Sequence, residues 1–242
     1  MKEIVKRTLK RFDIDIGRSS FRKTIVDYIV NRDIDLVFDV GANVGQFASS
    51  LREKGYTGQI ESFEPVASVF RTLAQTAGSD PRWNAHNLAL GAEPGKAIIN
   101  ISESSVFSSL LPTTNAATAF AETAASRRTE EIEVSTLDHF ASLTAGANTL
   151  LKIDTQGFEK QVLLGARNTL SSIKGVLMEL PIIQLYEGNW QFHEAIAFMA
   201  EAGFVPAQIH PVNFHWIDEV SLVEVDCLFR PRDNRLDAKP AT

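Results

Sequence analysis

The feature that most constrains the fold is an apolar run that ends in an acidic residue and leads into a turn with two glycines. Residues 36–47 read LVFDVGANVGQF, with Asp39 near the end of the run and Gly41 and Gly45 four residues apart. This pattern predicts a buried parallel strand, a tight turn and a helix N-terminus. Glycine tolerates positive φ and lets another molecule approach the backbone, and the first turn of a helix presents unpaired N–H groups. We therefore expect a ligand at this strand–helix turn.

An acidic residue also follows the next strand along the chain. Residues 59–63 have the pattern of a strand, and Glu64 stands directly after them, where a carboxylate binds the ribose in nucleotide-binding folds. The two features together predict a cofactor that contains adenosine. The first turn lacks the third glycine of the G-x-G-x-x-G motif, which weakens the alternative of an NAD(P)-dependent oxidoreductase.

Composition limits the class of protein. A chain of 242 residues is most simply one α/β domain, and its net charge of −6 disfavours nucleic acid as a partner. The single cysteine, Cys227, excludes an internal disulfide and makes a zinc–cysteine cluster implausible. No apolar run reaches the length of a membrane span and no signal peptide is evident, so we expect a soluble, cytoplasmic protein.

The ends of the chain and one internal segment differ in character from the rest. Residues 1–33 predict an N-terminal helical extension, whose first twelve residues carry five lysines and arginines. We favour an apolar stripe that docks on the protein body; the alternative is weak contact with an anionic membrane surface. Residues 103–129 have few large apolar groups and predict a loop insert with a weak helix near 116–125, either a lid or an exposed connector. Residues 231–242 are expected to be a polar tail.

A second block repeats the logic of the first. In residues 150–159, LLKIDTQGFE, an apolar strand is followed by Asp154, a glycine turn and a helix, and a later strand at 176–180 carries Glu179. Ligands bind beyond the carboxyl ends of parallel strands. We therefore expect Asp39, Glu64, Asp154 and Glu179 to lie on one rim. Further strands are predicted at 83–90, 96–102, 131–134, 204–209 and 221–229, and residues 210–216 form a connector rich in potential ligand-binding groups.

Six short motifs occur in an order that resembles a known family. They are DVGANVG at 39–45, FEP at 63–65, ALG at 89–91, KIDTQGFE at 152–159, LLGA at 163–166 and DCLF at 226–229. The chain is similar to the FkbM family of S-adenosylmethionine-dependent methyltransferases over residues 34–230. The resemblance implies a Rossmann-like class I methyltransferase fold: a mostly parallel seven-stranded sheet with an antiparallel last strand and helices on both faces. It also implies an enzyme of class EC 2.1.1 that methylates a hydroxyl of a sugar, a glycolipid or another secondary metabolite.

The resemblance assigns roles to residues at the two turns. The glycines let the amino-acid tail of S-adenosylmethionine approach, with Asp39 accepting from its ammonium group and Asn43 beside the same tail. Glu64 takes both ribose hydroxyls, which suits the paired oxygens of a carboxylate, and Ala89 borders the adenine. The expected cofactor-binding residues are Asp39, Gly41, Asn43, Gly45, Glu64, Pro65, Ala89 and Gln156.

Methyl transfer to a hydroxyl needs an aligned acceptor and a group that takes its proton. Asp154, at a strand end that faces the reacting centre in this class, is the first candidate base, and Glu179 is the second. The two carboxylates could instead hold a divalent cation such as Mg²⁺, which prefers few protein carboxylates. A non-catalytic module that binds S-adenosylmethionine is the remaining alternative. The sequence does not identify the acceptor.

Overall fold

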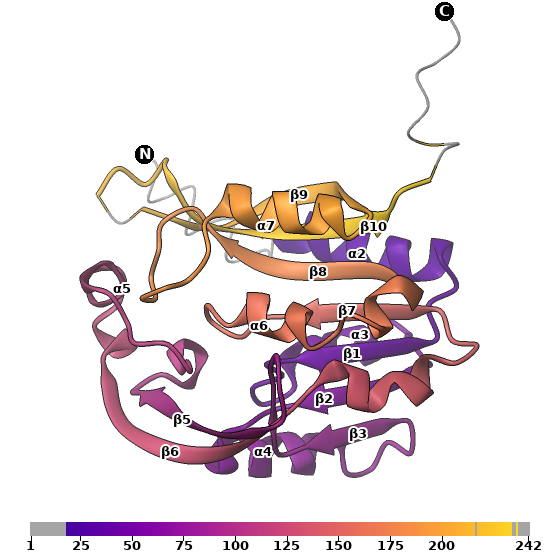
Figure 1. Ribbon diagram of the computed structural model, residues 1–242, viewed down its shortest axis with the longest axis horizontal. Helices are drawn as coiled ribbons and strands as arrows, with labels where there is room; N and C mark the ends of the chain where they lie inside the picture. Colours follow the sequence, from indigo (N-terminus) through magenta and orange to yellow (C-terminus); the bar gives the residue numbers. More distant parts are fainter. Residues whose placement is uncertain (1–17, 216, 234–235, 237–242) are drawn as a thin grey trace, which may run out of the picture.

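A seven-stranded sheet forms the centre of the protein (Figure 1). The computed structural model describes residues 18–215, 217–233 and 236. The strand order is β3-β2-β1-β7-β8-β10-β9, and every neighbouring pair is parallel except the two that involve β10. The predicted sheet with an antiparallel last strand is therefore confirmed. The strands are β1 (Leu36–Val40), β2 (Gln59–Phe63), β3 (Trp83–His86), β7 (Thr149–Ile153), β8 (Ile173–Pro181), β9 (Phe204–Phe214) and β10 (Leu222–Pro231).

Helices cover both faces of this sheet, as expected (Figure 1). One face carries α2 (Arg18–Asn31), α3 (Gln46–Glu53) and α4 (Ala67–Ala77). The other carries α6 (Glu159–Leu164), α7 (Phe192–Glu201) and the 3-10 helices η3 (Leu137–Thr144) and η4 (Thr169–Ser172). Helix α2 belongs to the expected N-terminal extension, whose residues 1–17 lie outside the described residues.

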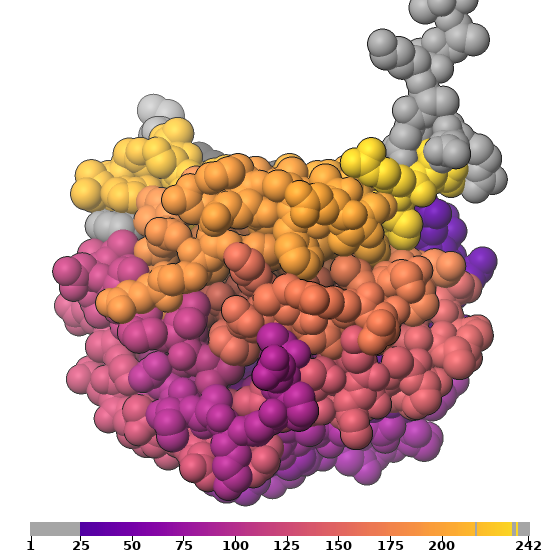
Figure 2. All heavy atoms as spheres, in the orientation of Figure 1, coloured from indigo at the N-terminus to yellow at the C-terminus, as the bar shows by residue number. Residues whose placement is uncertain are grey.

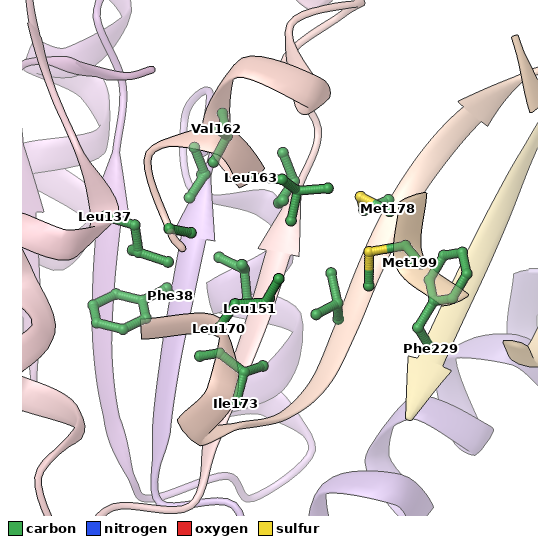
Figure 3. Packing of buried hydrophobic residues seen from close by; sticks show 14 of the residues in the cluster. Phe38, Leu137, Leu151, Val162, Leu163, Leu170, Ile173, Met178, Met199 and Phe229 are labelled. Carbon is green, nitrogen blue, oxygen red and sulfur yellow. The ribbon is translucent and has the colours of Figure 1, made fainter. Parts of the chain in front are cut away.

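The central strands are buried on both sides, which explains their continuous apolar sequence. All five residues of β1 and of β7 are buried. On one face Phe38 and Leu151 pack against Val162 and Leu163 of α6 and, further along the sheet, Met178 meets Met199 of α7 (Figure 3). On the other face Leu51 of α3 and Leu73 of α4 belong to a second buried cluster. Two cores therefore hold the carboxyl ends of the parallel strands in fixed register.

A second, three-stranded sheet lies beyond those carboxyl ends (Figure 1). Its order is β4-β6-β5, with β4 at Ala89–Leu90, β5 at Gly95–Ser102 and β6 at Ser126–Ser135. The single strand predicted at 83–90 is wrong, because residues 83–86 pair with β2 whereas Ala89 and Leu90 pair with β6. The strand predicted at 131–134 begins five residues earlier, and β9 continues through the expected connector to Phe214.

The expected loop at 103–129 is ordered over much of its length. It contains η1 (Ser105–Phe107), α5 (Asn115–Phe120) and η2 (Glu122–Ala124), and β6 begins at Ser126. The small residues of the insert are partly buried despite the lack of large apolar groups. Ala117 and Ala124 lie in a buried cluster with Leu185 and Tyr186 from the segment after β8. Figure 2 shows this insert in contact with the orange residues beside it on one face of the molecule.

Among the described residues, no helix has the length and apolar character that crossing a membrane requires.

Candidate functional site

The turn between β1 and α3 has the backbone conformation that its glycines predict. Gly41 has φ of +74° and Gly45 has φ of +92°, and Asn43 also has positive φ, at 50°. A Cβ atom on Gly41 would lie 1.8 Å from the backbone oxygen of Asp154, so only glycine lets the two turns approach this closely. Gly45 instead packs beside the Trp83 ring, which a Cβ atom on this glycine would approach to 3.0 Å. Gly41 therefore allows close approach of the second turn, whereas Gly45 allows close packing against Trp83.

Glu64 is buried at the end of β2 and anchors the same turn. Its Oε2 accepts a hydrogen bond from the backbone N–H of Asn43 at 3.0 Å, and its Oε1 accepts one from Val66 N–H at 2.9 Å. Burial raises the pKa of Glu64 to about 7, although these two hydrogen bonds and the charge of Lys152 act in the opposite direction. Each carboxylate oxygen keeps further acceptor capacity toward a ligand.

Asp39 is fully buried below the turn and pairs with Lys152. Its Oδ1 lies 3.0 Å from Lys152 Nζ, and its Oδ2 accepts a hydrogen bond from Ser62 Oγ at 3.3 Å. Lys152 also donates to the carbonyl of Gly41 at 2.9 Å. Lys152 is not among the site residues predicted from the sequence. A lysine inside an apolar strand was the available signal, since lysine is almost never buried without a partner.

The second turn brings the two candidate catalytic acids together through an amide. Gln156 Nε2 donates to Asp154 Oδ1 at 2.8 Å and to Glu179 Oε1 at 3.3 Å. Its Oε1 accepts a hydrogen bond from the Tyr186 hydroxyl at 2.7 Å, and its φ is 55°. The amide therefore has partners at both ends, and its side chain fixes the spacing of the two carboxyl groups.

Glu159 holds this second turn from inside. Its Oε1 accepts hydrogen bonds from Thr155 N–H at 3.1 Å, from Thr155 Oγ1 at 3.2 Å and from Gly157 N–H at 3.0 Å. Burial raises the pKa of Glu159 to about 7, and the backbone hydrogen bonds moderate that rise. Its role is to shape the loop between β7 and α6, since it does not line the main cavity.

More acids lie beside Glu179 than the sequence pattern predicts. Asp226 of β10 stands opposite Glu179 in the strand register, and the Oε2 of Glu224 accepts a hydrogen bond from Asn213 Nδ2 at 2.8 Å. Burial raises the pKa of Glu179 well above its usual range, and the negative charges of Asp154, Glu224 and Asp226 add to the rise. Burial also raises the pKa of Glu224. Only the register between β8 and β10 reveals this cluster.

One cavity of about 700 Å³ joins the two turns, a size that suits a ligand of cofactor dimensions. Eight of the ten predicted site residues line it. These are Gly41, Asn43, Glu64, Pro65, Ala89, Asp154, Gln156 and Glu179. Asp39 and Gly45 are absent from its lining: the first is below the turn and the second packs into the core. Of the four acids expected on one rim, Glu64, Asp154 and Glu179 face the cavity and Asp39 does not.

The insert contributes to the same cavity and is tied to both turns. Asn43 Nδ2 donates to Ser105 Oγ at 3.2 Å, and Ser109 Oγ donates to the carbonyl of Gln156 at 2.6 Å. Residues 105–110, Phe120 and Ala121 all line the cavity. The connector predicted to bind a ligand contributes too, through residues 210–213 of β9.

The residues that line the cavity fit a nucleoside-containing cofactor. Glu64 presents a buried carboxylate to the cavity, whose paired oxygens can accept hydrogen bonds from two hydroxyls, and small Ala89 leaves room at the cavity wall. Within the described residues, no group of three or more His, Cys, Asp or Glu side chains is arranged to hold a metal ion.

Comparisons with known proteins bear on the family of this chain. The model of the FkbM methyltransferase domain matches residues 39–206. Fibrillarin of Aeropyrum pernix, solved with natively bound S-adenosyl-L-methionine, is 11% identical, with 81% of this chain and 66% of that chain covered and a TM-score of 0.46. An rRNA methylase of Streptococcus thermophilus is 8% identical, with coverages of 87% and 95% and a TM-score of 0.46. TehB of Haemophilus influenzae is 9% identical, with coverages of 87% and 62% and a TM-score of 0.47.

No curated protein matches the chain. The family match includes both turns, because it runs from Asp39 in β1 to the start of β9. It includes the two sequence blocks that line the cavity. The chain therefore belongs to the FkbM methyltransferase family.

Proposed function

We propose that the protein is an S-adenosylmethionine-dependent O-methyltransferase whose acceptor is a hydroxyl of a sugar, a glycolipid or another secondary metabolite. One observation carries the proposal. Gly41 and Asn43 of the first turn, Glu64 after β2, and the acids Asp154 and Glu179 all line one cavity. A methyl donor and a group that takes a proton are the two things that O-methylation requires.

Glu64 and the backbone of the first turn would hold the cofactor. S-adenosylmethionine, when bound, supplies an electrophilic methyl group on a positively charged sulfur. The carboxylate of Glu64 accepts hydrogen bonds from the ribose hydroxyls, and the glycine backbone at Gly41 leaves room for the amino-acid tail. The buried ion pair of Asp39 and Lys152 supports the turn from below.

Asp154 of the second turn and Glu179 of β8 would together take the proton of the acceptor hydroxyl. Gln156 Nε2 donates to both Asp154 and Glu179, so one amide nitrogen holds the two carboxyl groups close together. Burial and the negative charges around it raise the pKa of Glu179, which makes its carboxylate a stronger proton acceptor than an ordinary one. Asp154, whose side chain is 37% exposed, would orient the hydroxyl.

The test is a methyl-transfer assay with labelled S-adenosylmethionine and a panel of sugars, glycolipids, polyketides and RNA. Mass spectrometry of the product locates the methyl group. We expect transfer to an oxygen of a hydroxylated acceptor, and a loss of about 10²- to 10⁴-fold in kcat for Asp154→Asn or Glu179→Gln. Methylated RNA, or methyl groups on nitrogen, would contradict the proposal.

Binding measurements separate the alternatives. Calorimetric titration with S-adenosylmethionine, S-adenosylhomocysteine and NAD should show affinity for the two sulfur compounds alone. Binding of NAD alone would favour an oxidoreductase. Binding of the sulfur compounds without transfer to any acceptor would indicate a non-catalytic module. A parallel assay with EDTA tests the requirement for a divalent cation, and we expect no loss of rate.

A further inference from the structure

One buried ammonium group reaches both turns of the site. Lys152 lies in β7 directly beside Asp39 of β1. Its Nζ is 3.0 Å from Asp39 Oδ1, donates to the carbonyl of Gly41 at 2.9 Å and lies 3.7 Å from Asp154 Oδ2. Gly41 belongs to the first turn and Asp154 to the second. The position of Nζ therefore sets how the first turn lies relative to Asp154.

The charge of Lys152 is held in place by its surroundings. The residue is 8% exposed, and its Nζ lies 5.8 Å from the centre of the Phe47 ring. Burial alone would lower the pKa of Lys152, but the carboxylates of Asp39 and Asp154 outweigh it and raise that pKa. The group is therefore an ammonium, and fully buried Asp39 compensates its charge within the protein.

We propose that Lys152 is a positioning residue for methyl transfer, which acts through Asp154 and the Gly41 carbonyl, and that Asp39 cancels its charge beside a cationic methyl donor. The inference rests on the proposed function. A free ammonium at the cavity wall would repel the positive sulfur of the donor, because opposition between like charges is strong in a partly dry site. The ion pair allows a lysine to tie the turns together without that repulsion.

The first experiment separates positioning from folding. Lys152→Met alone leaves the buried Asp39 without its cationic partner and should lower the thermal midpoint. The double variant Asp39→Asn/Lys152→Met removes both charges and should recover most of the midpoint. We expect its kcat nevertheless to stay about a hundredfold below that of the wild type, the cost of a misplaced reacting group. Lys160→Met, which removes an exposed lysine of α6, should leave both quantities unchanged.

The second experiment reads the charge directly and needs no acceptor. Asp39→Asn removes the nearest carboxylate from Lys152 and leaves only the more distant Asp154 at 3.7 Å, so calorimetry should show a larger loss of affinity for S-adenosylmethionine than for S-adenosylhomocysteine, whose sulfur is neutral. We expect the ratio of the two dissociation constants to change at least fivefold, a rough lower bound for a charge pair near a surface. A purely structural role for the pair predicts equal losses.

The outcomes distinguish this inference from the proposed function. If the wild type transfers a methyl group and the double variant matches its kcat, the role of Lys152 is refuted and the function stands. If Asp39→Asn lowers the affinity for both sulfur compounds equally, the role of Asp39 in cancelling the charge is refuted, and the other claims stand. If the wild type binds S-adenosylmethionine but methylates no acceptor, O-methylation fails, while the shifted ratio of dissociation constants still supports the ion pair. If the wild type does not bind S-adenosylmethionine, both proposals are overturned.

Discussion

Acidification from pH 8 to pH 6 should weaken binding of the methyl donor, because Glu64 must be ionised to accept hydrogen bonds from both ribose hydroxyls. Glu64 is only 7% exposed, and burial raises its pKa to about 7 despite the hydrogen bonds from Val66 and Asn43. A carboxyl group with an ordinary pKa would remain ionised over this whole range.

The size of the effect follows from that pKa. With a pKa of about 7, roughly nine-tenths of Glu64 is ionised at pH 8 and roughly one-tenth at pH 6. The apparent Kd should therefore rise about tenfold, which corresponds to about 1.4 kcal/mol of binding free energy. Stability changes in the opposite sense: a folded-state pKa above the unfolded value stabilises the protein at low pH, and this contribution, of the order of 3 kcal/mol, is lost as pH rises from the ordinary pKa of 4.5 to the folded pKa of about 7.

Calorimetric titration of S-adenosylmethionine at pH 6, 7 and 8 measures this dependence. Glu64→Gln should bind weakly at every pH and show little slope. The matched control is Glu61→Gln on the same strand: burial would raise the pKa of Glu61, but hydrogen bonds from His86, Asn84 and Gln59 outweigh it and keep that pKa low. This variant should therefore retain the tenfold change. A wild-type Kd that is constant over the range, or a slope that survives in Glu64→Gln, would refute the reasoning.

Three further predictions concern the two turns. Gly41→Ala should destabilise the protein by about 3 kcal/mol or more in urea unfolding, because its Cβ would lie 1.8 Å from the backbone oxygen of Asp154 and its φ is +74°. Gln156→Leu should lower kcat at least tenfold with a smaller effect on donor affinity, since it removes the amide that spaces Asp154 from Glu179. Ser109→Ala should cost about 1 kcal/mol of stability and raise the acceptor KM, because it frees the carbonyl of Gln156.

The sequence predicted the parallel half of the fold well because local signals there agree with the tertiary structure. The strand predicted at 59–63 has those bounds, and the two glycine turns have the positive φ that their residues indicate. Pairing between distant strands left no such local signal. The run at 83–90 has one continuous strand-like pattern, yet its two ends belong to different sheets. The pattern of a strand does not identify its neighbour.

The sequence predicted the acids that line the cavity but not the buried ion pair of Asp39 and Lys152 below the first turn. Glu64, Asp154 and Glu179 follow the rule that ligands bind at strand carboxyl ends, and all three line the cavity. Asp39 follows the same rule but is fully buried, because the register of β1 and β7 places Lys152 beside it. Nothing in the local sequence of either strand identifies the other as its neighbour. An acid at a strand end can therefore bind a ligand or hold the turn that binds it.

The insert contacts both turns of the cavity. Ser105 contacts Asn43 of the first turn, and Ser109 contacts Gln156 of the second turn, which lies beside Asp154 and Glu179. Ala117 packs in a buried cluster with Tyr186, whose hydroxyl donates to the same Gln156. A ligand that displaces either serine contact must move a segment that also contacts the other turn. Donor and acceptor affinities should therefore be coupled through the insert, since coupling requires a shared element whose position both ligands affect.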